Sequence, residues 1–246
     1  RERARSLALL GAVHVMTGRF DEAYSFFEQS LGLFRELDDR RNVGVLLDSL
    51  GETARLRGDY AAAVARFEEA LSIAREIGER VGQMTYLSNL GGALIGLEDY
   101  AGAETRLRAA IALVGASGYN GLSETYRFLA EACLGEGKTA EALEAAKAAL
   151  MFGQKAGNQE FVGGAWRALG LVAARLHEPV SIDDRVYEPT ACFAESLRIF
   201  TEVGMEAERA RTLRDWASYE NERGDSGRGL AMWQESREIF SRLGIE

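Results

Sequence analysis

The stretch LGETARLRGDYAAAVARFEEALSIAREIG, from Leu50 to Gly78, decides how this chain folds. Its apolar residues recur at steps of three and four on both sides of Arg57-Gly58-Asp59, and this spacing predicts two amphipathic helices joined by a tight turn. Glycine suits a left-handed helix C-terminus and aspartate suits a helix N-cap, so Gly58 ends the first helix and Asp59 begins the second. The stretch therefore predicts one helical hairpin.

The same hairpin recurs along the whole chain of 246 residues. Its leading apolar residue is Leu10, Leu50, Leu90, Leu129, Leu169 and Trp216 in six successive copies. Self-similarity at a period of about 40 residues is typical of stacked helix pairs, because one pair cannot bury its apolar face alone. We therefore expect an all-α fold, a single α-α superhelix, with repeats at about 4–41, 42–81, 82–120, 121–160, 161–207 and 208–246.

Each copy pairs a small residue on the first helix with a large residue on the second. The small residues are Gly11, Gly51, Gly91, Ala130, Gly170 and Ala217. Phe27, Phe67, Leu107, Phe193 and Trp233 occupy the large position, where the fourth copy has Ala146. A missing side chain lets two helix backbones approach closely while the large residue fills the space beside them.

This pattern resembles the tetratricopeptide repeat, which has a large apolar residue, Leu-Gly, Ala and an aromatic residue on a helix pair. The resemblance implies a right-handed superhelix of six helix-turn-helix repeats. Two features depart from the family: the period exceeds the usual length of about 34 residues, and glycine replaces the closing proline. Long repeats of this kind are similar to those of bacterial signalling and transcription regulators, and of certain eukaryotic adaptor and motor-cargo proteins.

One spacing in the series is longer than the others. The stretch HEPVSIDDRVYEP, from His177 to Pro189, contains both prolines of the chain and adds seven residues to the turn of the fifth copy. Proline disfavours a continued helix but suits the first turn of a new one, so we expect a loop over residues 178–188. A neutral surface insertion, a recognition loop and a mobile hinge all fit this pattern, and the neutral insertion is favoured because surface loops tolerate added length.

Composition and charge exclude several classes of function. A net charge of −9 and a pI near 5.0 disfavour binding to nucleic acid. No apolar run reaches the length of about 20 residues that a membrane span needs, and no signal peptide begins the chain, although it starts at Arg1 instead of methionine. We interpret Cys133 and Cys192 as free, buried thiols of a cytoplasmic protein.

The residues that catalysis requires are scarce. His14 and His177 are the chain's two histidines, and neither has a partner at catalytic or metal-ligand spacing. The segment from Gly135 to Thr139 imitates the end of a phosphate-binding loop, but Ala132 replaces the first glycine of that motif and no strand precedes it. We therefore expect a chain that is not an enzyme and has no catalytic residues, no metal and no cofactor.

The resemblance implies a partner-binding groove along the concave face formed by the first helices. In the family, groove residues lie two before, and two and five after, the Leu of the Leu-Gly pair, together with adjacent positions. Carried over, this frame gives Asp48, Glu52, Arg55, Ser88, Asn89, Arg127, Phe128, Glu131, Arg167, Arg175, Arg211, Arg214 and Asp215. The later positions are mostly basic, so we expect a protein or peptide partner with an acidic segment, while Asn89 holds the peptide backbone.

Two alternatives stay open beside the interaction module. The array fits the regulatory arm of a larger bacterial protein that senses a small ligand or its own amino-terminal ATPase and DNA-binding portions. It also fits a structural scaffold that self-associates as a homodimer through its terminal repeat, because Tyr219 and Trp233 belong to a final copy that has no following helix.

Overall fold

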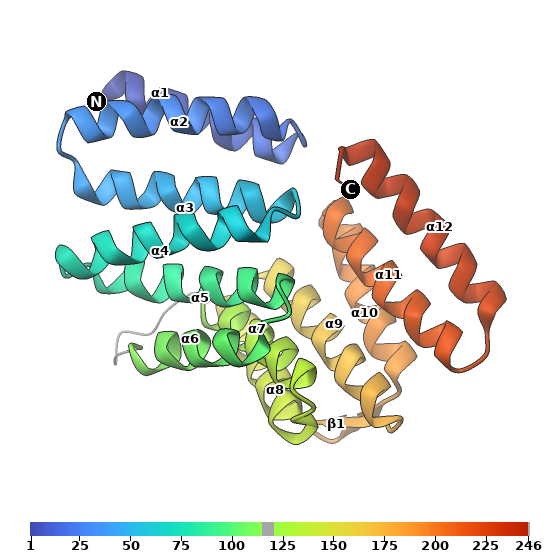
Figure 1. Ribbon diagram of the computed structural model, residues 1–246. Coiled ribbons are helices and arrows are strands. Elements are labelled where there is room, and N and C mark those ends of the chain that lie inside the picture. Colours follow the sequence, from blue (N-terminus) through green and yellow to red (C-terminus); the bar gives the residue numbers. More distant parts are fainter. Residues whose placement is uncertain (115–120, 246) are drawn as a thin grey trace. The chain divides into compact units, whose positions relative to one another are not determined.

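The computed structural model describes residues 1–114 and 121–245. These residues form twelve α-helices and one two-stranded hairpin, and the chain divides into two compact units (Figure 1). Unit 1 contains α1 (Glu2–Met16), α2 (Phe20–Glu36), α3 (Arg40–Leu56), α4 (Tyr60–Glu76), α5 (Arg80–Gly96) and α6 (Tyr100–Ala112). Unit 2 contains α7 (Leu122–Gly135), α8 (Thr139–Ala156), α9 (Gln159–Leu176), β1 (Val180–Ile182), β2 (Arg185–Tyr187), α10 (Pro189–Glu202), α11 (Glu206–Glu222) and α12 (Ser226–Leu243).

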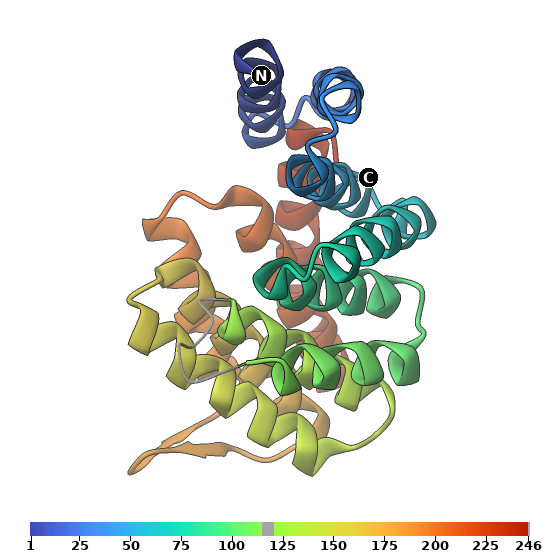
Figure 2. The same ribbon diagram turned by 90° about the vertical axis from the view of Figure 1, so that its left-hand side faces the viewer.

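Helices within each unit pack in sequence order. In unit 1, each helix contacts the next from α1 to α6, and α3 also contacts α5. In unit 2, each helix likewise contacts the next, and α9 contacts both α7 and α11 (Figure 2). Among the odd-numbered helices, which are the first helices of each pair, α3 therefore lies beside α5, and α9 lies beside α7 and α11. The predicted all-α fold of stacked helix pairs is confirmed.

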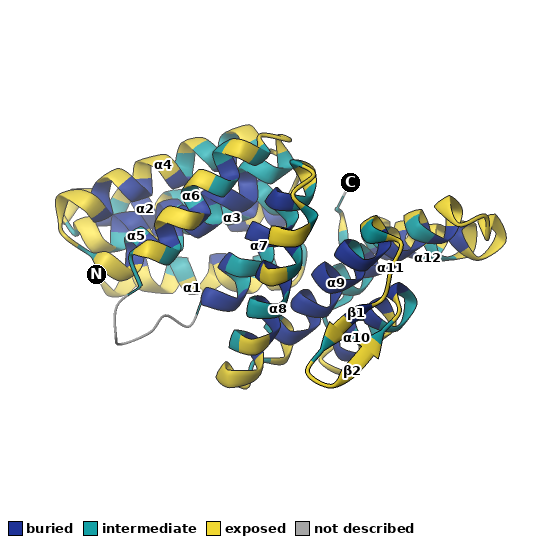
Figure 3. Ribbon diagram, turned by 90° about the horizontal axis from the view of Figure 1, so that it is seen from below, coloured by how far each residue is buried: buried dark blue, intermediate teal, exposed yellow. Residues whose placement is uncertain are grey.

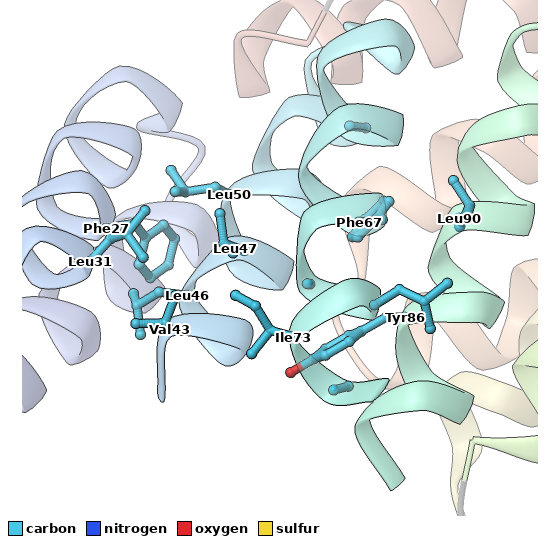
Figure 4. Packing of buried hydrophobic residues seen from close by; sticks show 14 of the residues in the cluster. Phe27, Leu31, Val43, Leu46, Leu47, Leu50, Phe67, Ile73, Tyr86 and Leu90 are labelled. Atoms are coloured by element: carbon cyan, nitrogen blue, oxygen red, sulfur yellow. The ribbon is translucent and has the colours of Figure 1, made fainter. Parts of the chain in front are cut away.

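The predicted contact between a small and a large residue holds the helix pairs together. A Cβ atom added to Gly51 would lie 2.6 Å from the ring of Phe67, and one added to Gly170 would lie 2.8 Å from Phe193. Figure 4 shows Phe67 among the apolar side chains of unit 1, where it is fully buried. The final copy differs: Trp233 is 42% exposed, because α12 ends the described helices of unit 2 and no later helix of that unit covers this position.

The predicted helix ends are also present. Gly58 takes φ of +82°, and the side chain of Asp59 accepts a hydrogen bond of 3.1 Å from the backbone nitrogen of Ala62. The equivalent Asp99 caps α6 in the same way, although the residue before it is Glu98, at φ of +60°, instead of glycine. A helix end expected at Gly118 lies outside the described residues.

The loop expected over residues 178–188 is instead a β-hairpin. Strand β1 pairs antiparallel with β2, with Val180 opposite Tyr187 and a two-residue turn at Asp183-Asp184. The hairpin also contributes to the core, because Val180 is buried and the ring of Tyr187 lies 4.9 Å from that of Trp166 on α9. This packing against α9 explains why the insertion forms two strands and not an irregular loop. Helix α9 is itself buried along most of its length (Figure 3).

The segments that resembled reactive sites have structural explanations. The segment from Gly135 to Thr139, which resembles the end of a phosphate-binding loop, connects α7 to α8, and Gly137 turns the chain there with a φ of +75°. Both cysteines are buried and lie outside any disulfide of the described residues, and burial raises the pKa of Cys192 to about 12. The ring of His14 packs against Phe26 at 5.0 Å. Among the described helices, none is long and apolar enough to cross a membrane.

Candidate partner-binding surface

In unit 1, the candidate residues of α3 and α5 are joined by a polar contact between the two helices. The side-chain amide of Asn89 donates a hydrogen bond of 2.8 Å to the carboxylate of Asp48. On α3, the guanidinium of Arg55 donates to Glu52, with a shortest distance of 2.8 Å. Ser88 is 2% exposed, so it does not present a surface to a partner. The structure thus brings Asp48 and Asn89 together on neighbouring first helices.

A residue that the sequence frame missed lies behind this pair. Tyr86, one turn before Asn89 on α5, is buried, and Gly44 on α3 leaves room for its hydroxyl, which lies 3.2 Å from where a Cβ would stand. Burial raises the pKa of Tyr86 well above its usual range, and the carboxylates of Asp48 and Glu79 add to this shift. The hydroxyl therefore stays protonated at neutral pH.

In unit 2, Arg127 on α7 lies between two carboxylates of its own helix. Its guanidinium donates hydrogen bonds of 2.7 Å to Glu131 and 2.9 Å to Glu124, and it lies 4.1 Å above the ring of Phe128. Phe128 is 4% exposed, so its ring supports Arg127 from below and is not open to a partner. A Cβ at Gly164 of α9 would lie 2.9 Å from Arg127, so the arginine crosses onto α9.

Arg167 connects α9 to α11 through two carboxylates. This arginine is 5% exposed, and its guanidinium donates a hydrogen bond of 2.8 Å to Glu208 and lies 3.7 Å from Asp215. Glu208 also pairs with Arg211, and Asp215 lies 3.9 Å from Arg214. Arg167 is therefore nearly inaccessible and is enclosed by these carboxylates.

These side chains form two bonded groups, one around Arg127 and one around Arg167, which together with Glu160 we call the unit 2 charge network. Its members are Glu124, Arg127 and Glu131 on α7, Glu160 and Arg167 on α9, and Glu208, Arg211, Arg214 and Asp215 on α11. Burial raises the pKa of Asp215, opposed by Arg167 and Arg214 and reinforced by Glu131 and Glu208. Desolvation also raises the pKa of Glu160, with Glu124 and Glu208 adding to the effect and Arg127 opposing it. The remaining candidate, Arg175, is exposed in the last turn of α9.

The two units share one positional rule. The residue two before the leading apolar residue of one first helix contacts the residue one before it in the next first helix, as Asp48 contacts Asn89 and Arg167 contacts Asp215. The frame taken from the resemblance included all four residues but did not include Glu208. Complementary residues at these two repeat positions are the sequence signal that identifies the cross-helix pairs.

Comparison with known proteins supports this reading of the fold. A model of the tetratricopeptide repeat family matches residues 2–76. No curated protein matches the sequence at a significant level.

Several solved structures share the fold over nearly the whole chain. The crystal structure of the apo form of RapI is 17% identical, with a TM-score of 0.82 over 99% of this chain and 85% of that one. Aspartyl phosphate phosphatase F from Bacillus subtilis is 15% identical, with a TM-score of 0.80 over 100% of this chain and 62% of that one.

The Rap conjugation gene regulator of plasmid pLS20, in complex with the Phr* peptide, is 14% identical, with a TM-score of 0.81 over 99% of this chain and 63% of that one. The chain thus spans under two thirds of two of these three proteins, and at such identities the likeness shows the fold alone.

Proposed function

From the tetratricopeptide repeats of residues 2–76 and the helix pairs that continue them, we propose that the chain is a non-catalytic protein–protein interaction module. It binds a peptide or a partner domain along the surface of its first helices, and it serves as the regulatory or sensor arm of a larger bacterial signalling or transcription-regulatory protein. The site residues are the exposed and half-buried members of the candidate set, on α3 and α5 in unit 1 and on α7, α9 and α11 in unit 2.

One observation carries this proposal: polar side chains on successive first helices bond to one another across the helices. The pair of Asp48 and Asn89 fixes the positions of a carboxylate and an amide on the surface of unit 1. A carboxylate accepts hydrogen bonds, and an amide both donates and accepts them, so the pair has the chemistry to bind an extended peptide backbone. Because the two side chains are already fixed, they lose less conformational entropy when a peptide binds.

The similar structures support the class of partner. One of them is named as a gene regulator in complex with a peptide, and its fold matches this chain over nearly its whole length. The acidic segment expected in the partner rests only on the series of arginines at the later positions of the sequence. Such a segment would have to displace the carboxylates that Arg127 and Arg167 already contact.

The test is selection of phage-displayed random decapeptides on the immobilised chain, followed by affinity measurement with a labelled selected peptide. Replacing Asn89 by alanine removes a side chain that orders the site, and we expect binding to weaken about tenfold. The matched control is Glu144→Ala on α8, a carboxylate whose side chain is 77% exposed and lies on a second helix. Failure to enrich any peptide, or equal binding by both variants, would refute the proposed surface.

A second candidate, self-association as a homodimer through the terminal repeat, is favoured by the outer face of α12. Leu230 is 53% exposed and Trp233 is 42% exposed, with the guanidinium of Arg237 at 4.8 Å from the indole ring. Exposed apolar side chains at helical spacing are suited to contact with another helix. Light scattering should then give a dimer that dissociates in Trp233→Gln, and a strict monomer would remove this candidate.

A further inference from the structure

The hydroxyl of Tyr86 ends a buried side chain and has no hydrogen-bond partner within the described residues. Tyr86 is 5% exposed, and Figure 4 shows its ring among the apolar side chains of unit 1, with the oxygen atom pointing away from Leu90. Among the described residues, the fully buried side-chain polar atoms without a partner are Nδ1 of His14 and Oε2 of Glu220. The hydroxyl of Tyr86 is not one of them, so its oxygen reaches the surface.

This hydroxyl lies over α3, beside the hydrogen-bonded pair of Asp48 and Asn89. Gly44 leaves room for it, because a Cβ there would lie 3.2 Å from the hydroxyl oxygen and 3.5 Å from the nearest ring carbon. Gly44 precedes Asp48 by four residues and Tyr86 precedes Asn89 by three, so this contact lies one helical turn before the pair. One turn rises about 5.4 Å, a distance that two residues of an extended peptide span. A peptide that contacts the pair can therefore also reach Tyr86.

The charges around the hydroxyl decide which acceptor suits it. Burial raises the pKa of Tyr86, and the carboxylates of Asp48 and Glu79 add to this shift. The guanidinium of Arg41 opposes them. The hydroxyl thus stays protonated and can donate at neutral pH. Because two negative charges act on it against one positive charge, a neutral carbonyl oxygen is a better acceptor there than a carboxylate.

We infer that the hydroxyl of Tyr86 donates a hydrogen bond to a neutral amide carbonyl of the partner, in the peptide main chain or in an asparagine or glutamine side chain. The inference rests on the proposed function and adds a donor to the surface formed by Asp48 and Asn89. A buried ring fixes the donor before binding, so little side-chain entropy is lost. The donor also displaces no partner within the chain, whereas the guanidinium groups of Arg127 and Arg167 already contact carboxylates.

The first test is Tyr86→Phe in the full chain, measured with a labelled decapeptide from the selection described above. Removing the oxygen atom alone should weaken binding about three- to tenfold, the range for one hydrogen bond. The melting temperature should change by less than about 2 °C, because no hydrogen bond within the chain is lost. The matched control is Tyr24→Phe on α2, a second helix, where the hydroxyl accepts a hydrogen bond of 2.9 Å from Arg66. This control should leave binding unchanged.

The outcomes separate this inference from the proposed function. Equal binding by Tyr86→Phe and the unmodified chain would overturn the inference and leave the proposed function in place. A weakening as large in Tyr24→Phe as in Tyr86→Phe would also overturn it. A selection that enriches no peptide would overturn both.

The second test identifies the acceptor in the peptide. Each aspartate, glutamate, asparagine and glutamine of the selected peptide is replaced by alanine in turn, and each peptide is measured against Tyr86→Phe and the unmodified chain. If one replacement of an asparagine or glutamine removes the difference between the two proteins, that side chain is the acceptor. If no replacement removes it, the acceptor is a main-chain carbonyl. Loss of the difference on replacing an aspartate or glutamate would identify a carboxylate and overturn the inference.

Discussion

The contact between Gly51 and Phe67 predicts that a glycine-to-alanine substitution has different effects at two helical positions. Alanine at position 51 should clash with the ring of Phe67, whereas alanine at position 32, where a Cβ meets no neighbour, should stabilise the chain. A Cβ at Gly51 would lie 2.6, 2.8 and 2.9 Å from three ring atoms of Phe67, far inside van der Waals contact. Gly32, on α2, is also helical, but a Cβ there would meet nothing within 4 Å. Replacing either glycine by alanine gains about 1 kcal/mol of helix propensity, so the two substitutions differ in sterics alone.

The magnitude follows from these two terms. Gly32→Ala should stabilise the chain by about 1 kcal/mol, which corresponds to a rise of about 2–4 °C in melting temperature for a chain of this size. In Gly51→Ala, the ring of Phe67 must move in a fully buried site, and overpacking of this kind costs about 1–3 kcal/mol. Gly51→Ala should therefore be less stable than Gly32→Ala by about 1–3 kcal/mol.

The assay is urea denaturation of the full chain followed by circular dichroism at the helical band, with the two single variants compared. A double-mutant cycle with Phe67→Ala isolates the contact, because Gly51→Ala should regain its helix-propensity benefit once the ring is absent. The fourth copy already combines Ala130 with Ala146, and both are fully buried. Equal stabilisation by Gly51→Ala and Gly32→Ala would refute the close-approach explanation of the repeat.

Three further predictions concern other parts of the structure. Asp59→Ala removes the cap of α4 and should lower the free energy of unfolding by about 1 kcal/mol in the same denaturation assay. Tyr187→Ala should lower the melting temperature and change tryptophan fluorescence because it uncovers Trp166, whereas Asp184→Ala at the hairpin turn should change neither. The raised pKa of Asp215 means that its ionised form opposes folding above the pKa in the folded chain, and that this cost disappears below its ordinary value of 3.8. Asp215→Asn should therefore not reduce stability at pH 7, and any stability that it gains over the unmodified chain should disappear as the pH falls below 3.8. Melting curves measured across this pH range test the prediction. A loss of stability at pH 7 would contradict it.

The helix pairs could be predicted from the sequence because each relies on a local pattern that recurs. Apolar spacing gave the helices, Gly58 and Asp59 gave the turn, and the pairing of Gly51 with Phe67 gave the close approach. The hairpin was missed because strands of three residues are too short to show a clear alternation. The hairpin is held by the contact between Tyr187 and Trp166, two residues that lie far apart in the sequence.

The candidate surface was predicted less completely, since its electrostatics depend on neighbouring helices. The sequence placed Arg167 at the surface position of a first helix, but its burial results from Glu208 and Asp215 on the next first helix. Phe128 was included as a contact residue because it adjoins Arg127, yet the arginine covers its ring. Exposure and pairing at these positions are tertiary properties that repeat spacing does not encode.

The hairpin between α9 and α10 also offers a place to modify the molecule. Its base is fixed by Val180 and Tyr187, while Asp183 and Asp184 at the turn are exposed. Gly170 and Phe193 meet across the insertion as the equivalent residues do elsewhere, so extra chain length here leaves the helix register intact. A fluorophore or an affinity tag joined at this turn would therefore be carried on an ordered stem, away from the helix contacts that stabilise unit 2.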